Sequence, residues 1–304
     1  MSQLAIVIVT YQTRDLLRKC LSSLQAECER FLTEWNVIVV DNASTDGTSD
    51  MVRSEFPHVG LIANPENLGP ARAFNIGVSK AVCLSDLIVV MNSDVLILPG
   101  TLEKMMAYLE DHPEVDGVSG PFYYPDMTPQ KTRTHIMRLF PINRGRPFRE
   151  DFVGTTFAMI RSRAYRKVGG YDENYYFYNE DLDWAERSKR AGCTFVHLPD
   201  AGAIHVLGQG RKQNVSRIIR ELYKSNIYYF KRHYPRLSRL ALLAFRLEIW
   251  LRILALRREL ASTGDEARRA ELMAAIATYT EARRNMDNEY PRRPEPRVPT
   301  FFSG

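Results

Sequence analysis

The polar residues with the clearest chemical potential follow a fully apolar run. Residues 87–91 are all apolar, and Asn92, Ser93 and Asp94 come directly after them. Such a run is typical of a strand buried on both faces, whose carboxyl end delivers polar residues to a ligand crevice. Asp94 is then either a loop-start residue satisfied by nearby backbone N–H groups or a ligand for a hard cation.

Two other predicted strands end in polar residues of the same kind. Asp41 closes the apolar run at 37–40, and Thr10 and Tyr11 follow the run at 4–9. Parallel neighbouring strands bring such residues to one edge of a sheet, where they form a cradle for a nucleotide. The expected nucleotide-binding residues are Thr10, Tyr11, Asp41, Asn67, Arg72, Asn92, Ser93 and Asp94. No GxGxxG follows the first strand and no P-loop motif occurs, so side chains and a metal must hold the nucleotide.

An acidic helix start and a lone histidine each have a structural as well as a chemical interpretation. Glu180, Asp181 and Asp183 open a predicted helix at 179–192, and His205 stands alone in a short apolar segment. Acidic residues are ordinary at the start of a helix, and a lone histidine is ordinary in a core. Taken separately, both features are explained by structure.

The apolar periodicity predicts alternating strands and helices, an α/β fold with a mostly parallel central sheet. Thr13 is placed to cap the first helix with its side chain, and Pro70 suits the first turn of the third helix. The expected strands lie at residues 4–9, 37–40, 61–62, 87–91, 115–118, 152–160, 195–198 and 203–206. The expected helices follow Thr13 and lie around residues 51–52, 70–81, 99–109, 164–168 and 179–192.

The remaining segments have a different character. Residues 123–149 are basic and lack periodicity, which is typical of a functional or mobile loop. Residues 211–260 interleave leucine and arginine at helical spacing, with a break at Pro235. This pattern suits contact with an anionic membrane surface, and it equally suits packing on the catalytic domain or on a partner subunit in a homodimer. The Pro- and Arg-rich tail at 291–304 is expected to be extended or disordered.

Composition narrows the class of protein. The chain has 304 residues, 45% of them hydrophobic, with a net charge of +5. The charge favours an anionic partner, but no nucleic-acid-binding motif accompanies it, so phosphorylated small molecules or lipid headgroups fit better. The four cysteines show no metal or disulfide spacing. We also expect no leader and no membrane span, and therefore a cytoplasmic protein, at the inner face of the cell membrane if 211–260 binds lipid.

In these motifs the chain resembles the family 2 inverting glycosyltransferases of the GT-A fold, and among them the rhamnosyltransferase-like members. The matching segments appear in family order over about 200 residues. They are IVIVTYQ at 6–12, VIVVDNASTDGT at 37–48, NPENLGPARAFNIG at 64–77, MNSD at 91–94, GGYDENYYFYNEDLDWAERSKRAG at 169–192, and His205. Three positions depart from the family pattern, because Asn92 replaces an Asp, Gln12 an Asn and Pro70 an aromatic residue.

The resemblance assigns roles to these residues. It implies that Asp94 and His205 bind a divalent metal, Mg²⁺ or Mn²⁺, and that Asp181 is the catalytic base. The positive end of the helix dipole is expected to keep Asp181 ionised. The expected acceptor-binding residues are Gly154, Thr155, Glu180, Asp183 and Trp184.

The resemblance implies a metal-dependent inverting hexosyltransferase. The donor is dTDP-rhamnose or a UDP-hexose, and the acceptor is a hydroxyl of a saccharide or lipid-linked glycan, in the biosynthesis of cell-surface polysaccharide. The expected domains are 1–210 for catalysis (1–120 donor half, 121–210 acceptor half), 211–290 for a helical extension, and 291–304 for the tail. A sugar-nucleotide nucleotidyltransferase and a non-catalytic sugar-nucleotide-binding scaffold are the alternatives.

Overall fold

A computed structural model describes residues 4–30, 34–130, 146–150, 154–206, 215–286 and 295–301. The chain divides into two compact units. The sheet unit contains Met1–Glu173, Glu180–Gly210 and Val298–Gly304, and the helical unit contains Asn174–Asn179 and Arg211–Arg297. The separation of a donor half from an acceptor half within the first 210 residues stays a prediction.

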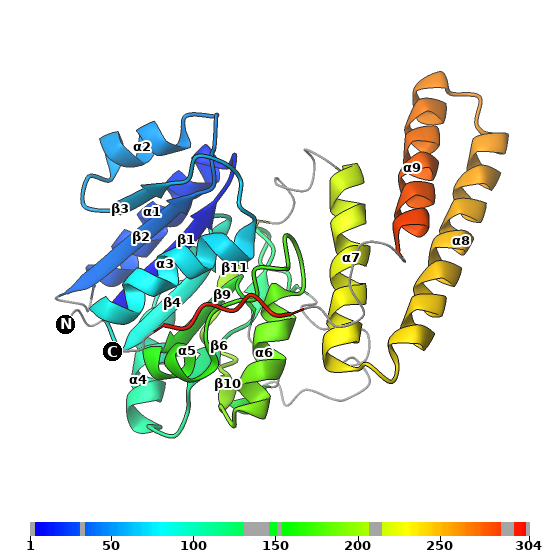
Figure 1. The fold of residues 1–304 in the computed structure, drawn as a ribbon. Coiled ribbons are helices and arrows are strands. Elements are labelled where there is room, and N and C mark those ends of the chain that lie inside the picture. Colours follow the sequence, from blue (N-terminus) through cyan, green and yellow to red (C-terminus); the bar gives the residue numbers. More distant parts are fainter. Residues whose placement is uncertain are drawn as a thin grey trace. The chain divides into compact units, whose positions relative to one another are not determined.

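The sheet unit is built on one large mixed sheet (Figure 1). Its strand order is β3-β2-β1-β4-β9-β6-β10-β8, and the first four strands are parallel to one another. The strands are β1 (Leu4–Thr10), β2 (Trp35–Asp41), β3 (Gly60–Ala63), β4 (Leu87–Asn92), β6 (Gly117–Ser119), β8 (Phe148–Glu150), β9 (Phe157–Arg161) and β10 (Phe195–His197). A mostly parallel sheet flanked by helices is the expected GT-A architecture, which is confirmed.

A small second sheet has the order β5-β11-β7. Its strands are β5 (Val95–Ile97), β7 (Phe122–Tyr123) and β11 (Ala203–His205). β11 runs antiparallel to β5, with His205 opposite Val95. This pairing carries His205 back to the residues that follow β4.

Helices cover both faces of the large sheet. Ile6 and Ile8 of β1 enter one apolar core, with side chains of α1, α2 and α4, whereas Ala5 and Val7 enter the other, with side chains of α3, α5 and α6. This alternation explains why an uninterrupted apolar run forms a central strand. The helices are α1 (Arg14–Cys28), α2 (Thr48–Glu55), α3 (Pro70–Leu84), α4 (Thr101–Asp111), α5 (Ser162–Val168) and α6 (Glu180–Arg190).

α3 packs closely on the sheet at a glycine. A Cβ added at Gly77 would lie 2.3 Å from Cγ1 of Val7 and 3.2 Å from Cγ2 of Val40. Glycine is therefore required there, because any side chain would push α3 away from β1.

Two local expectations are wrong. The strand expected at 152–160 begins only at Phe157, because residues 154–156 leave the ladder to form a turn. The stretch at 123–149 is not wholly irregular, since β8 pairs antiparallel with β10; residues 131–145 lie outside the described residues.

The end of the tail is also more ordered than expected. Phe301 is 6% exposed and packs in the sheet unit against the ring of Tyr165. The backbone N–H of Gly170 donates to the carbonyl of Pro299 at 2.9 Å. Residues 298–301 therefore belong to the folded sheet unit.

The helical unit contains α7 (Val215–His233), α8 (Ser238–Ser262) and α9 (Glu266–Asn285). Its core includes Tyr223, Ile227, Ile249 and Ile253. The break between α7 and α8 lies at Pro235, as predicted. Among the described residues, no helix is long and apolar enough to cross a membrane.

Candidate functional site

The ends of the parallel strands define the candidate site. Thr10 at the end of β1 lies opposite Asp41 at the end of β2, and Val9 lies opposite Asn92 at the end of β4. The sheet register thus brings together the three predicted strand-end groups, as expected for parallel neighbours. Tyr11, the next residue after β1, is 39% exposed.

A chain of hydroxyl groups joins two of these strand ends. The Thr13 hydroxyl lies 2.8 Å from the hydroxyl of Thr10 and 2.8 Å from that of Ser93. Thr13 is at the N-cap of α1, but its side chain makes no capping hydrogen bond, so the predicted side-chain cap is wrong. Because Thr10 and Ser93 are buried, their hydroxyls act first as links between β1 and β4.

Asp41 orders the loop that follows its own strand. It is 1% exposed, and its two oxygens accept from the Ser44 N–H at 3.0 Å and the Ser49 hydroxyl at 2.5 Å. Gln12, in the left-handed region with φ of 54°, donates from its backbone to the Ser44 hydroxyl at 2.8 Å. Its side-chain amide also donates to the Thr45 hydroxyl at 2.9 Å. A carboxylate accepts about four hydrogen bonds, so Asp41 retains capacity for a ligand.

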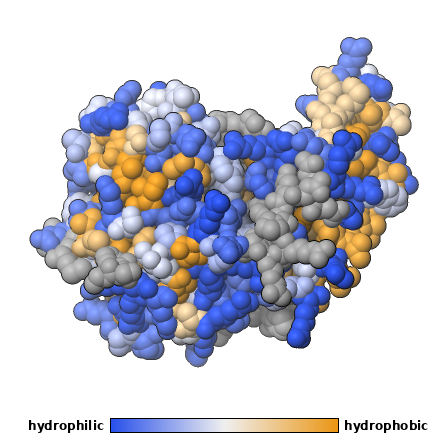
Figure 2. Space-filling model, in the orientation of Figure 1, coloured by the Kyte–Doolittle hydropathy of each residue, from blue (hydrophilic) through white to orange (hydrophobic). Residues whose placement is uncertain are grey.

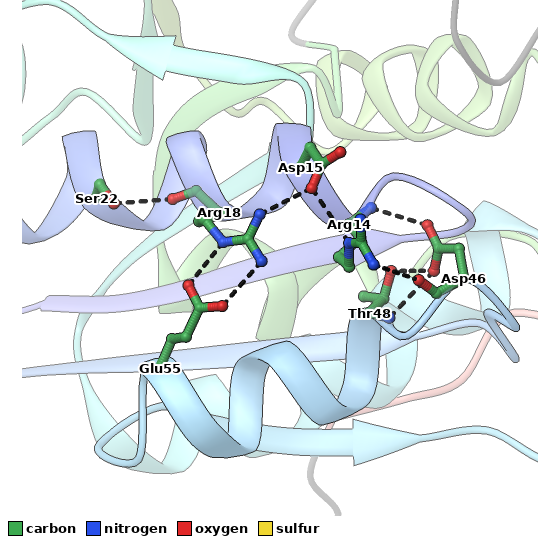
Figure 3. Close-up of polar contacts among 7 residues, drawn as sticks. All are labelled: Arg14, Asp15, Arg18, Ser22, Asp46, Thr48 and Glu55. Atoms are coloured by element: carbon green, nitrogen blue, oxygen red, sulfur yellow. Dashed lines mark hydrogen bonds and ion pairs between the residues drawn. The ribbon is translucent and has the colours of Figure 1, made fainter.

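The same loop is tied to α1 and α2 on its outer side (Figure 3). The Asp46 carboxylate accepts from the backbone N–H groups of Arg14 at 2.9 Å and Thr48 at 3.1 Å. The guanidinium of Arg18 in α1 donates two hydrogen bonds to the Glu55 carboxylate of α2, at 2.6 and 2.8 Å. Exposed ion pairs of this kind contribute little stability.

Asn67 and Arg72 are held differently from one another. The Asn67 side-chain oxygen accepts from the Asn42 amide and from the Gly69 N–H, both at 3.0 Å, so it shapes its own loop. Arg72 has a half-exposed side chain and pairs with Glu173 at 3.1 Å. A half-exposed pair is weak and exchangeable, which leaves Arg72 the better placed of the two to bind a phosphate.

Asp94 and His205 lie together, although 111 positions separate them in the sequence. Nε2 of His205 lies 3.5 Å from Oδ1 of Asp94, and the N–H of Val206 donates to the Asp94 carbonyl at 2.8 Å. The side-chain amide of Gln130 donates a hydrogen bond to the His205 carbonyl at 2.6 Å.

The Asp94–His205 pair fits a divalent cation. A distance of 3.5 Å exceeds a usual hydrogen bond. It is close to the roughly 3 Å between neighbouring ligands of an octahedral ion bound at about 2.1 Å. The described residues contain no cluster of three or more His, Cys, Asp or Glu side chains able to hold a metal. The imidazole favours Mn²⁺ over Mg²⁺.

The turn at 154–156 connects this edge to the acidic helix start. The Asn92 N–H donates to the Thr156 carbonyl at 3.0 Å. The backbone N–H of Thr155 hydrogen-bonds the Asp181 carboxylate, as does the N–H of Leu182 at 2.8 Å. Asp181 and the end of β4 therefore flank one short turn.

Burial dominates the electrostatics of Glu180 and Asp181. Burial raises the pKa of Asp181 to about 6, against the backbone N–H groups of Leu182, Asp181 and Thr155, which favour the charged form. Burial, and then the charge of Asp181, raises the pKa of Glu180 to about 8. Desolvation is the largest influence on both carboxyl groups, so the ionised Asp181 expected at the helix start stays a prediction. Burial thus disfavours the charged form of both carboxyl groups, and Oε2 of Glu180 has no hydrogen-bond partner.

Asp183 and Trp184 do not fit the predicted contact with an acceptor. Asp183 is 0% exposed and binds Nε of Arg187 at 2.8 Å. Trp184 is also 0% exposed, and its indole N–H donates to the carbonyl of Gly169 at 2.9 Å. Trp184 therefore anchors α6 to the turn at Gly169, whereas Asp183 is held in an ion pair within α6.

Three further residues shape the site but were not predicted to do so. The sequence analysis noted Gln12 only as a departure from the family pattern and Thr13 only as a helix cap, and it did not single out Gln130. Part of the aromatic run at 171–178 belongs to the helical unit. There the rings of Tyr175 and Tyr228 are 4.7 Å apart.

The chain is similar in sequence to known glycosyltransferases. An N-acetylglucosaminyl-diphospho-decaprenol L-rhamnosyltransferase of Mycobacterium tuberculosis is 28% identical over 240 residues, 66% of this chain and 75% of the relative. A dTDP-rhamnosyl transferase of Shigella flexneri is 26% identical over 219 residues, 68% of this chain and 70% of the relative.

Solved structures show the same fold. A mannosyltransferase of Pyrobaculum calidifontis, in complex with GDP-Man and Mn²⁺, has a TM-score of 0.58 at 19% identity, covering 95% of this chain and 84% of that one. S. aureus TarS has a TM-score of 0.55 at 16% identity, covering 92% of this chain and 71% of that one. Residues 5–169 match the family described as Glycosyl transferase family 2, and the chain therefore belongs to that family of glycosyltransferases.

Proposed function

We propose that this glycosyltransferase moves a sugar, with inversion, from a nucleoside-diphosphate donor to a hydroxyl of a saccharide or lipid-linked glycan. Rhamnose is the favoured sugar and dTDP the favoured nucleotide, because relatives are rhamnosyltransferases and one is a dTDP-rhamnosyl transferase. A relative that modifies a decaprenol-linked N-acetylglucosamine supports a lipid-linked acceptor.

The observation that carries the proposal is the turn at 154–156. It contacts the end of β4 through Asn92 and the Asp181 carboxylate through Thr155. A donor held at the strand ends and an acceptor beside Asp181 would therefore meet over one short segment. A direct displacement needs the base and the leaving group on opposite sides of the sugar, and this turn supports the proposal that the two groups approach one sugar.

In this proposal Asp181 takes the proton from the acceptor hydroxyl as the oxygen attacks the anomeric carbon. The anomeric carbon–oxygen bond to the diphosphate breaks, and the nucleoside diphosphate leaves with the electron pair. A carboxylate with a pKa of about 6 is a stronger base than an ordinary aspartate and is still ionised at neutral pH. A single displacement gives a product of inverted configuration.

Asp94 and His205 are the proposed ligands of a divalent cation, with Mn²⁺ the better fit. When bound, the cation would neutralise the charge of the leaving diphosphate as a Lewis acid. Asp41, Tyr11 and Arg72 remain the proposed contacts to the nucleotide.

A thermal-shift panel tests the donor site. Ligands at about 100 times their dissociation constant should stabilise the protein by roughly 2.7 kcal/mol. We expect dTDP or UDP with Mn²⁺ to raise Tm, and Asp94→Ala to abolish the Mn²⁺-dependent part. No shift with any nucleoside diphosphate would contradict the proposal. Pyrophosphate formation would favour a nucleotidyltransferase, and binding without release of nucleoside diphosphate would favour a scaffold.

A further inference from the structure

The helical unit carries an exposed apolar surface on α8. Five side chains form what we call the outer face, with exposed fractions between 46% and 65%. They are Leu240, Leu243, Leu247, Trp250 and Leu251. Their spacing of three to four residues places them along one side of the helix. Figure 2 shows hydrophobic side chains at the surface of this unit.

The opposite side of α8 is already used for packing. Ile249 is 0% exposed and Ile253 is 7% exposed, both in the core shared with α7 and α9. α8 is therefore apolar on two sides, whereas a surface helix ordinarily presents a polar face to water. The outer face has the composition of a buried surface and lacks a partner within the described helical unit.

The arginines beside the outer face indicate the chemical nature of its partner. α8 carries five arginines and two glutamates. At about 100° per residue, Arg239 and Arg257 fall on one arc beside Trp250. Arg258 lies at the carboxyl end of the outer face, in line with Leu240 and Leu247. Arg239, Arg257 and Arg258 are all exposed.

The two glutamates are engaged elsewhere. Glu248 pairs with Arg252 at 2.8 Å, and Glu259 pairs with Arg268 at 2.7 Å. A second copy of α8 would therefore bring arginines, and no unpaired carboxylate of α8, to this arc. Anionic lipid headgroups provide the missing negative charge, and leucine and tryptophan enter the interfacial layer of a bilayer.

We propose that the outer face of α8 docks on an anionic lipid bilayer, with Leu240, Leu243, Leu247, Trp250 and Leu251 in the interface and the flanking arginines on the headgroups. The helix lies in the plane of the surface. The interaction depends on salt, because headgroup attraction is screened within about a Debye length.

Co-sedimentation of the full chain with vesicles tests this proposal without any substrate. We expect binding at low salt to vesicles containing phosphatidylglycerol and much weaker binding to pure phosphatidylcholine. The double variant Leu243→Glu/Leu247→Glu should bind at least about tenfold more weakly, since burial of one leucine contributes about that factor or more. Arg239→Glu/Arg257→Glu should weaken binding only to the anionic vesicles.

Met273→Glu is the matched control, because Met273 of α9 is also exposed, at 55%. It should bind like the wild type. All these positions are exposed, and unfolding curves of the variants verify that they fold. The proposal is overturned by absent binding at low salt, by equal binding to neutral vesicles, or by an equal loss in Met273→Glu. A dimer that the leucine variant dissociates, with unchanged vesicle binding, would assign the face to a second copy instead.

Discussion

Substitution of Asp181 by asparagine should separate catalysis from stability. Burial raises the pKa of Asp181 from 3.8 to about 6, a difference of about two pH units that corresponds to about 3 kcal/mol. Since the folded-state pKa is the higher one, this carboxylate destabilises the folded protein at neutral pH, and the penalty vanishes as the pH falls below about 4. Asp181→Asn should therefore raise the free energy of unfolding at pH 7.5, by up to about 3 kcal/mol.

The same variant should lose most of its activity. A positioned general base contributes about 10²- to 10⁴-fold in rate, so kcat should fall by that factor while donor affinity changes little. The wild-type kcat should rise with pH and level off above about 6, following the pKa of Asp181. Urea unfolding and initial rates of sugar transfer measure the two effects.

Two neighbours on α6 serve as controls. In Glu180→Gln, kcat should still rise with pH around 6 as in the wild type. Glu180 is already uncharged at that pH, because its pKa is about 8. Asp183→Asn should cost about 3 kcal/mol of stability by breaking the buried pair with Arg187, with a smaller loss of kcat. An Asp181→Asn variant that is less stable than the wild type, or transfers sugar at its rate, would refute the reasoning.

Two further predictions concern stability, measured by denaturant midpoints. Glu27 is 3% exposed and accepts from two backbone N–H groups at the start of α4, at 2.9 and 3.2 Å. Glu27→Gln should cost about 1–2 kcal/mol, and an unchanged midpoint would contradict this capping role. Gly77→Ala should cost about 1–3 kcal/mol because its Cβ would meet Val7. The control Gly264→Ala, whose Cβ meets nothing within 4 Å, should stay near the wild-type value, and equal effects would argue against the close contact.

The main strands were predictable because both of their faces are buried. β1, β2 and β4 appear as uninterrupted apolar runs, and their polar closing residues meet at one edge by the geometry of parallel strands. β5, β7 and β8 have only two or three residues each and pair with strands far along the chain. Their residues carry no local signal, since the tertiary pairing alone makes them strands.

Only part of the candidate site could likewise be predicted from the sequence. The proximity of Asp94 and His205 followed from the family resemblance and not from spacing. Asp183 and Arg187 stand four residues apart, a spacing that indicates an ion pair within the helix. Whether that pair faces solvent or the core depends on packing that a lone helix does not reveal. The raised pKa of Asp181 could not be predicted from the sequence for the same reason, because desolvation depends on residues from several segments.

The most direct test of the central claim is the product formed from dTDP-rhamnose and a lipid-linked N-acetylglucosaminyl diphosphate. Transfer is followed by release of dTDP, and the anomeric configuration of the product is determined by NMR. We expect an inverted linkage, loss of transfer in excess chelator, recovery with Mn²⁺, and little transfer by Asp94→Ala. A retained configuration, or full transfer in chelator by the wild type, would contradict the account.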